Sequence, residues 1–147
     1  MLAGKWVRLA AERHLRDIAT GDERGLVWRM VRALHAIRFF SMLNLPDGAA
    51  AGKPFVLQPW QQFVVGSLFG WFGPDGRRRF RYGLIEVARA NGKSPLAAGL
   101  GLYGLIADGE QGAQIYSAAT TRDQAKIIYG DALHMAERSP GIMPRLT

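Results

Sequence analysis

The chain has 147 residues, of which 48% are hydrophobic and 21% charged, and these proportions exclude wholesale disorder. A formal net charge of +7 favours a polyanionic partner such as nucleic acid, although such a charge can also serve solubility alone. The chain has no Cys, which excludes a disulfide framework and a cysteine-based metal site. No run approaches the roughly 20 apolar residues of a membrane span, and the charged N-terminus is not a signal peptide.

The pattern from residue 2 to about residue 72 is helical. Apolar residues recur at a spacing of three to four at Val27, Met30, Val31, Leu34 and Ile37. Asp22 and Glu23 are placed to start this helix, since acidic residues favour the first turn. Residues 44–54, rich in Pro, Asp, Gly and Ala, are expected to form a loop.

A second helix is predicted from Pro59, because Pro is tolerated in the first turn of a helix. Its apolar residues fall on one face, at Trp60, Val64, Leu68 and Trp71. We interpret this stripe as core packing rather than as a ligand site, although Trp60 and Trp71 have rings able to stack on a base.

The pattern changes after the turn at residues 73–76. Residues 82–88 and 113–119 are short β-type runs, and residues 94–107 and 121–137 read as helices. Strand, glycine loop, helix, strand and helix are the opening of a parallel α/β sheet. We therefore expect an N-terminal helical segment, residues 1–72, followed by an incomplete α/β part, residues 73–147.

The run VARANGKS, residues 87–94, lies between a predicted strand and a predicted helix. A phosphate-binding loop has the form G-x-x-x-x-G-K-[ST], and this chain has Val87 in place of the first Gly. The match is partial, but the strand and helix on either side are the context that a phosphate cradle requires. The alternative is a glycine-containing turn with a solvated lysine.

Each residue of the loop has a physical role in the first interpretation. Gly92 lets the backbone approach phosphates, Lys93 supplies a mobile positive charge, and the Ser94 hydroxyl is a ligand for Mg²⁺. The Arg89 guanidinium is placed to stabilise charge on the γ-phosphate, so Arg89 and Lys93 are the candidate catalytic residues. The expected cradle for ATP comprises Ala88, Arg89, Ala90, Asn91, Gly92, Lys93 and Ser94.

At these residues the sequence resembles the ATPase part of the large terminase subunit of tailed phages, the motor that packages DNA into the capsid. The resemblance runs from about residue 37 to residue 139. Its segments are GKPFVLQPWQ (52–61), LFGW (68–71), RRF (78–80), EVARANGKS (86–94) and YSAATTRDQAKIIY (116–129). Phosphate loops in this family lack the first glycine and carry an arginine before the second, which accounts for Val87 and Arg89 together. The resemblance implies a P-loop NTPase fold of the ASCE type.

The resemblance implies further roles for residues outside the loop. Gln61 matches the glutamine that recognises adenine in this family, and a glutamine amide offers both a donor and an acceptor. The alternative is a helical glutamine facing water. Thr120, Thr121, Arg122 and Gln124 match a stretch near the nucleotide and the DNA track. The structural alternative, which we favour, is that Thr121 and Gln124 form a capping box.

Four arginines form the densest positive cluster of the chain: Arg77, Arg78, Arg79 and Arg81. In a DNA channel they would bind phosphates without reading sequence, which suits a motor that moves along any DNA. The alternative is a solvated turn before a strand, with successive side chains on opposite faces.

An ATPase of this class needs an acidic pair at the end of a later strand, and none follows Tyr129. We therefore expect an N-terminal fragment of a phage or prophage terminase without the nuclease domain, with weak nucleotide binding and negligible turnover. For the intact protein the resemblance implies ATP, Mg²⁺, double-stranded DNA, portal protein, small terminase subunit, a homo-oligomeric ring and a cytoplasmic location. The alternatives are another small P-loop NTPase or kinase, and a noncatalytic DNA-binding or assembly module.

Overall fold

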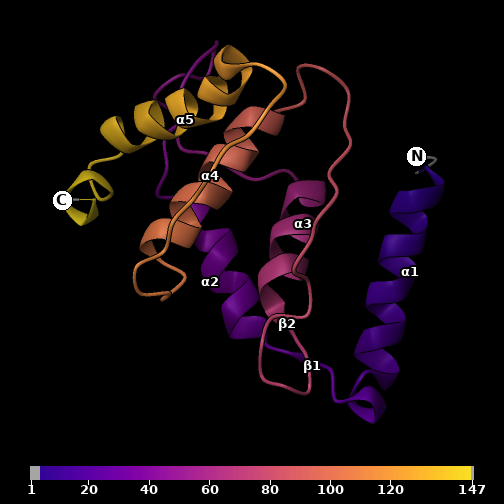
Figure 1. Ribbon diagram of the computed structural model, residues 1–147. Helices are drawn as coiled ribbons and strands as arrows, with labels where there is room; N and C mark the ends of the chain where they lie inside the picture. Colours follow the sequence, from indigo (N-terminus) through magenta and orange to yellow (C-terminus); the bar gives the residue numbers. More distant parts are fainter. Residues whose placement is uncertain (1–3, 147) are drawn as a thin grey trace.

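The computed structural model describes residues 4–146 and has a mixed fold of helices and short strands (Figure 1). Residues 1–3 of the predicted segment 1–72 and residue 147 of the predicted segment 73–147 lie outside the described residues. The elements, in order, are α1 (Lys5–Thr20), η1 (Asp22–Arg24), β1 (Val27–Trp28), α2 (Met30–Phe40), α3 (Pro59–Gly70), β2 (Trp71–Phe72), α4 (Lys93–Ile106), α5 (Arg122–Glu137) and η2 (Met143–Arg145). No helix within residues 4–146 has the length and apolar character needed to cross a bilayer.

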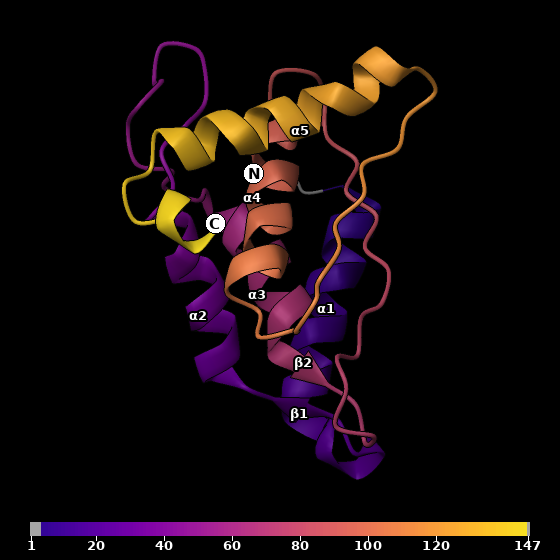
Figure 2. The same cartoon turned by 60° about the vertical axis from the view of Figure 1, so that its left-hand side comes forward.

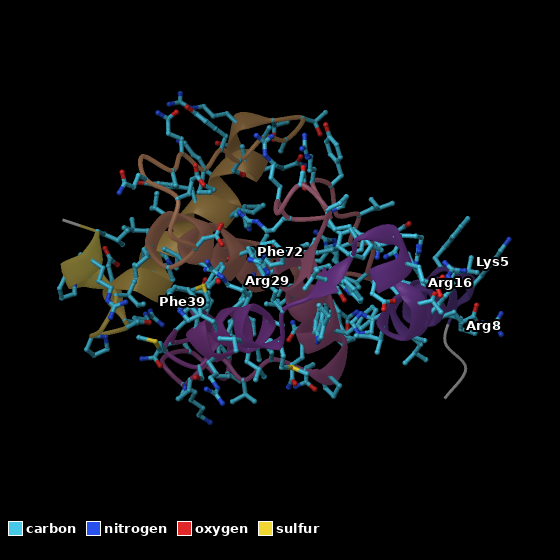
Figure 3. All side chains as sticks on the ribbon, turned by 90° about the horizontal axis from the view of Figure 1, so that it is seen from below. Lys5, Arg8, Arg16, Arg29, Phe39 and Phe72 are labelled. Carbon is cyan, nitrogen blue, oxygen red and sulfur yellow. The ribbon has the colours of Figure 1, made fainter. Side chains whose placement is uncertain are left out.

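Helix α1 stands at one side of the molecule, and α3 lies between α1 and α2 in both views (Figures 1 and 2). Three basic side chains of α1, those of Lys5, Arg8 and Arg16, lie at the edge of the molecule in Figure 3. The buried side chain of Asp17 attaches α1 to the rest of the chain. Asp17 is buried and accepts hydrogen bonds from Arg24 at 2.5 Å and from Arg79.

His14 forms the second attachment of α1. Its Nδ1 atom accepts a hydrogen bond from the indole N–H of Trp71 at 3.0 Å, and its ring packs edge-on against Trp28 and Phe63. Burial lowers the pKa of His14 and nearby Arg13 lowers it further, against the opposing effect of Asp17. The neutral imidazole is therefore the form that fits this site, because a protonated ring cannot accept the Trp71 hydrogen bond.

The start of the second helix differs from the prediction. Asp22 and Glu23 belong to η1, a separate 3₁₀ turn, and α2 begins only at Met30. Between them Val27 lies in β1, which pairs with β2 in an antiparallel two-stranded sheet. The chain reverses here because Gly25 adopts a left-handed conformation with φ of 67°. Helical spacing alone did not reveal this turn.

The side chain of Arg29 covers Phe72 of β2. The guanidinium of Arg29 lies 4.1 Å from the centre of the Phe72 ring, and Figure 3 shows the two residues side by side.

Helix α3 agrees with the prediction. It begins at Pro59, and its cap is a reciprocal pair in which the side chains of Gln58 and Gln61 bond each other's backbone N–H groups. Trp71 is 1% exposed and Trp60 packs against the core, so both rings serve packing, as predicted. Trp71 lies in β2 rather than on the helix face, however, and the apolar side chain that α3 buries fully is that of Val65. Helices α2 and α3 approach closely at Gly70 because this residue has no side chain. A Cβ there would overlap the ring of Trp28 and crowd Ala33 of α2.

The predicted parallel sheet does not form among the described residues. Residues 82–88 and 113–119 are extended but have no strand partner in the described chain, so the predicted parallel sheet is not confirmed. Tyr82 and Leu84 are each 93% exposed, and Tyr116 is 83% exposed. A strand needs neighbours for its backbone groups, and the described chain places none beside these segments. The α/β prediction holds only as a mixed helix and strand fold.

Helices α4 and α5 agree with the predicted helices and pack on each other (Figure 2). The core joins residues from both halves of the chain, including Phe40, Val65, Leu102 and Met135. The predicted loop at residues 44–54 is also present, closed by an antiparallel bridge between Asn44 and Pro54.

Candidate nucleotide site

The loop of residues 88–92 closes directly on the N-terminus of α4. Gly92 is the N-cap residue and has φ of 72° and ψ of 25°, a left-handed conformation that glycine adopts without strain. Ala90 has φ of 64° and is the one residue other than glycine with positive φ in the described chain. Alanine in this region is strained, and such strain occurs where the surrounding structure needs a specific backbone path. The loop therefore has a defined, tightly curved shape.

The backbone at the start of α4 leaves hydrogen-bond donors free. Leu96 is the first residue whose N–H bonds back, to the Gly92 carbonyl at 3.1 Å. The N–H groups of Lys93 and Ser94 precede it in the first turn, where helices have no partner for them. These donors and the positive end of the helix dipole favour an anion at this end.

Two side chains of the loop, those of Lys93 and Asn91, donate hydrogen bonds to backbone carbonyls of residues 87–89. Lys93 Nζ donates to the Val87 carbonyl at 3.1 Å, so the lysine lies back across the loop. Asn91 Nδ2 donates to the carbonyls of Ala88 at 3.3 Å and Arg89 at 3.4 Å. The Arg89 side chain is exposed. The mobile cation at position 93 thus has a weak carbonyl partner that an anionic ligand is able to replace.

A hollow of about 250 Å³ opens beside this loop. Its lining consists of Ile85, Lys93, Ser94, Leu96, Ala97 and Ile128. Ile85 comes from the extended segment before the loop and Ile128 from α5, and neither was predicted as a site residue. No local sequence signal marks Ile85 or Ile128, because the hollow forms only where the extended segment, α4 and α5 meet.

Gln61 lies beside the loop, 3% exposed. Its Oε1 accepts the Gln58 N–H at 2.8 Å, and its Nε2 would lie 3.4 Å from a Cβ at position 92. The alternative of a helical glutamine facing water was therefore wrong, because the side chain is buried between the helix cap and Gly92. Contact of Gln61 with adenine stays a prediction.

The stretch before α5 has the predicted capping contact. Thr121 is the N-cap residue, and its Oγ1 accepts the Gln124 N–H at 3.3 Å. The Gln124 side chain bonds Thr120 Oγ1 at 3.4 Å instead of returning to the Thr121 backbone. One half of the capping box is thus confirmed, and Arg122 is exposed in the first turn.

Two of the four clustered arginines are engaged within the chain. Arg78 forms an ion pair with Asp108 at 2.5 Å and lies over Phe69, and Arg79 pairs with the buried Asp17. Arg77 and Arg81 are exposed. Arg81 has only a loose contact of 4.0 Å with Asp75. The cluster as a whole is therefore not a free phosphate-binding surface. Arg78 and Arg79 are held in ion pairs within the chain, and Arg77 and Arg81 are exposed.

Residues 88–94 combine a curved glycine loop, backbone donors at a helix start, and a lysine and a hydroxyl beside a hollow. These are the features that the sequence predicts for a nucleotide-binding loop. The comparisons give the family. The model of the "Terminase large subunit, ATPase domain" matches residues 59–144. The chain therefore belongs to the terminase large subunit family, within its ATPase domain.

The large terminase of phage HK97 agrees with this assignment in both sequence and structure. The large terminase subunit of Enterobacteria phage HK97 is 30% identical over 113 residues, which cover 76% of this chain and 21% of that protein. The crystal structure of the HK97 bacteriophage large terminase matches with a TM-score of 0.64 and 28% identity over 77% of this chain and 22% of that one. The chain thus spans about a fifth of the length of these relatives.

Proposed function

We propose that this chain is the ATP-binding part of a large terminase subunit, the motor that drives double-stranded DNA into phage capsids. One observation carries the proposal: within the matched ATPase domain, residues 88–94 form a strained loop whose end is the open N-terminus of α4. This is the backbone arrangement that holds a nucleotide's phosphates.

The loop residues divide the work of binding. The free N–H groups of Lys93 and Ser94 face the phosphates, and Gly92 leaves room for them because it has no side chain. Lys93 leaves the Val87 carbonyl and places its charge on the β- and γ-phosphate oxygens. The cradle is completed by Ala88, Arg89, Ala90 and Asn91.

The residues present also fit a magnesium ion. The Ser94 hydroxyl lies in the first turn of α4 and lines the hollow together with Lys93, so it is the proposed metal ligand. When bound, Mg²⁺ neutralises charge on the phosphate oxygens. Arg89, with its exposed guanidinium, is the proposed stabiliser of the charge that develops on the transferred phosphate.

Gln61 is the proposed adenine contact. Its carbonyl oxygen is already engaged with the Gln58 N–H, which fixes the orientation of the amide, and its Nε2 is next to Gly92. The amide nitrogen is therefore the part of Gln61 that we expect to reach the base, as a donor to a ring nitrogen.

The remaining proposals concern the whole protein. In it, residues 82–88 and 113–119 become neighbouring strands of the parallel sheet of an ASCE-type ATPase, which gives their backbone groups partners. Residues 1–72 then form the helical segment that carries Gln61, and residues 73–147 the first βαβα part. Portal protein, small terminase subunit and a homo-oligomeric ring are the proposed assembly, and the exposed Arg77 and Arg81 are the proposed DNA contacts of the cluster.

Nucleotide binding tests the proposal. A fluorescent ATP analogue is titrated with the chain in Mg²⁺, and Lys93→Ala is compared with Lys126→Ala, a change of the same type at an exposed position of α5. We expect weak binding that Lys93→Ala lowers by about tenfold or more, since one charge-assisted contact is worth roughly 1.5 to 3 kcal/mol, while Lys126→Ala leaves binding unchanged. Equal effects of the two substitutions would refute the assignment of the loop.

Hydrolysis and DNA binding separate this proposal from its alternatives. We expect negligible turnover by the chain, because the acidic pair of this ATPase class is not in its sequence. Steady ATP hydrolysis abolished by Lys93→Ala favours a self-contained P-loop enzyme instead. Salt-dependent DNA binding together with no nucleotide binding favours a noncatalytic DNA-binding module.

A further inference from the structure

A groove runs over α3, with α2 on one side and α1 on the other. Figures 1 and 2 both show α3 between these two helices. The groove contains a hollow of about 220 Å³, lined by Met30, Leu34 and Ile37 of α2, Phe63 and Ser67 of α3, and His14 of α1. It lies apart from the nucleotide loop, with which it shares no lining residue.

The wall formed by α2 is apolar and open to solvent. Met30 is 54% exposed, Val31 80% and Leu34 37%, although all three are large hydrophobic residues on adjacent turns of one helix. Single exposed apolar residues are ordinary, but a contiguous group beside a hollow marks an interaction site. Helix α2 buries Ala36 and Phe40 in the core, and the buried Ala33 lines the hollow between Met30 and Ile37.

The floor of the groove contains an unsatisfied hydroxyl. Ser67 Oγ is inaccessible to solvent and has no hydrogen-bond partner in the described part of the chain. Buried hydroxyls are almost always hydrogen-bonded, so this one calls for a polar group that enters the hollow. An occupant that is purely apolar would leave it unsatisfied.

The α2 and α3 sides of the groove are basic, whereas α1 carries Glu12 as well as Arg13 and Arg16. Helices α2 and α3 contain no Asp or Glu, and from Gly25 to Pro74 the sequence has a single acidic residue, Asp47. The same span contains Arg29, Arg32, Arg38 and Lys53. Arg38 lies one turn beyond Leu34 on the same side of α2, at the rim of the apolar wall. The complementary surface is therefore acidic around an apolar stripe.

We propose that this groove binds an amphipathic helix of a partner protein, with apolar residues in the hollow, acidic residues facing Arg38, and one polar side chain bonded to Ser67. A groove between helices accepts a helix whose anchors recur every three to four residues. A second copy of this chain fits poorly, because its α2 surface is basic too and like charges repel. DNA supplies the negative charge but no apolar stripe to cover Met30, Val31 and Leu34.

Two labelled synthetic helical peptides test the proposal. Both have the same leucine stripe with one serine at its centre, and one carries glutamates and the other lysines on its flanks. Fluorescence anisotropy measures their binding to the 147-residue chain and to Leu34→Asp. Leu84→Asp is the matched control, because Leu84 is 93% exposed and does not line the hollow.

We expect the glutamate peptide to bind and the lysine peptide to bind at least about tenfold more weakly, since charge complementarity favours the acidic rim. Leu34→Asp should weaken binding of the glutamate peptide by about tenfold or more, and Leu84→Asp should leave it unchanged. Equal binding of the two peptides, or equal effects of the two substitutions, overturns the proposal. So does dimerisation of the chain that Leu34→Asp abolishes, or duplex DNA that competes for the groove.

Ser67→Ala distinguishes a binding role from a structural one. If the hydroxyl awaits a partner, its removal leaves the thermal stability of the free chain unchanged or raised, yet weakens binding of the glutamate peptide by a fewfold. Loss of stability without a change in affinity would show that Ser67 serves the fold alone, and would remove the polar contact from the proposal.

Discussion

The buried carboxylate of Asp17 holds α1 to the rest of the chain, and its removal is the sharpest test of the fold. The side chain is 1% exposed and accepts from Arg24 at 2.5 Å and from Arg79. Arg79 comes from the segment after β2, so the ion pair joins parts of the chain that are 62 positions apart. Asp17→Asn keeps the size of the side chain but removes its charge.

The expected loss follows from the exposure of the three groups. Breaking a fully buried ion pair costs about 3 to 5 kcal/mol. Arg24 is 46% exposed and stays hydrated, and Arg79 is 19% exposed and also lies over the Phe80 ring. We therefore expect Asp17→Asn to lower the free energy of unfolding by about 2 to 3 kcal/mol at neutral pH, less than for a fully buried pair. This corresponds to a melting temperature lower by roughly 4 to 12 °C.

The loss should depend on pH. Burial acts to raise the pKa of Asp17, but the hydrogen bonds and charges of Arg24 and Arg79 outweigh it and hold the pKa below its usual value. A carboxyl whose pKa is lower in the folded state stabilises the fold above its unfolded pKa of about 4 and loses this effect as pH falls through the folded pKa. Wild type and Asp17→Asn should therefore converge in acid.

Thermal unfolding followed by circular dichroism, with amide hydrogen exchange of α1, measures both effects. Faster exchange confined to α1 would mean that the helix detaches before the core unfolds. The control is Asp75→Asn, since Asp75 is 55% exposed and meets Arg81 only at 4.0 Å, so we expect a change below about 0.5 kcal/mol. Equal stability and exchange in wild type and Asp17→Asn at neutral pH would refute the reasoning.

Three further substitutions test helix packing and capping by thermal unfolding. Gly99→Ala should destabilise by about 1 to 3 kcal/mol, because its Cβ would overlap the buried Phe40 ring. Gly130→Ala, with open space around its Cβ in α5, should stabilise by about 0.5 to 1 kcal/mol, and the opposite order of these two would contradict the packing of α4. Thr121→Ala should cost about 1 kcal/mol by removing the acceptor for the Gln124 N–H, and no loss would exclude the cap.

Features that depend on a single helical turn were predicted well. Pro59, Gly92 and Thr121 mark the starts of α3, α4 and α5. Pro59 has no N–H to satisfy, Thr121 accepts the Gln124 N–H, and Gly92 adopts a left-handed conformation without strain. The loop of residues 88–94 was predicted in the same way, and its binding of a nucleotide stays a prediction. Its glycine, lysine and hydroxyl are consecutive in sequence, so their geometry follows from the local backbone path.

The sheet was beyond such reasoning. Residues 82–88 have an apolar strand pattern, yet pairing depends on a neighbour that no local signal supplies, and the described chain provides none. The exposure of Tyr82 and Leu84 follows directly from this absence of a neighbour. The reversal at Gly25 was missed for a related reason, since apolar spacing continued through the turn.

The sequence by itself determined the helices α3, α4 and α5 and the resemblance that the family match confirms. Only the tertiary structure decided which charges are buried and which surfaces stay open. No local sequence pattern predicts that Asp17 pairs with Arg79, or that the Gln61 side chain lies next to Gly92. The physical reason is that capping and loop geometry act within a few residues, whereas ion pairs, grooves and sheet partners depend on how distant segments pack.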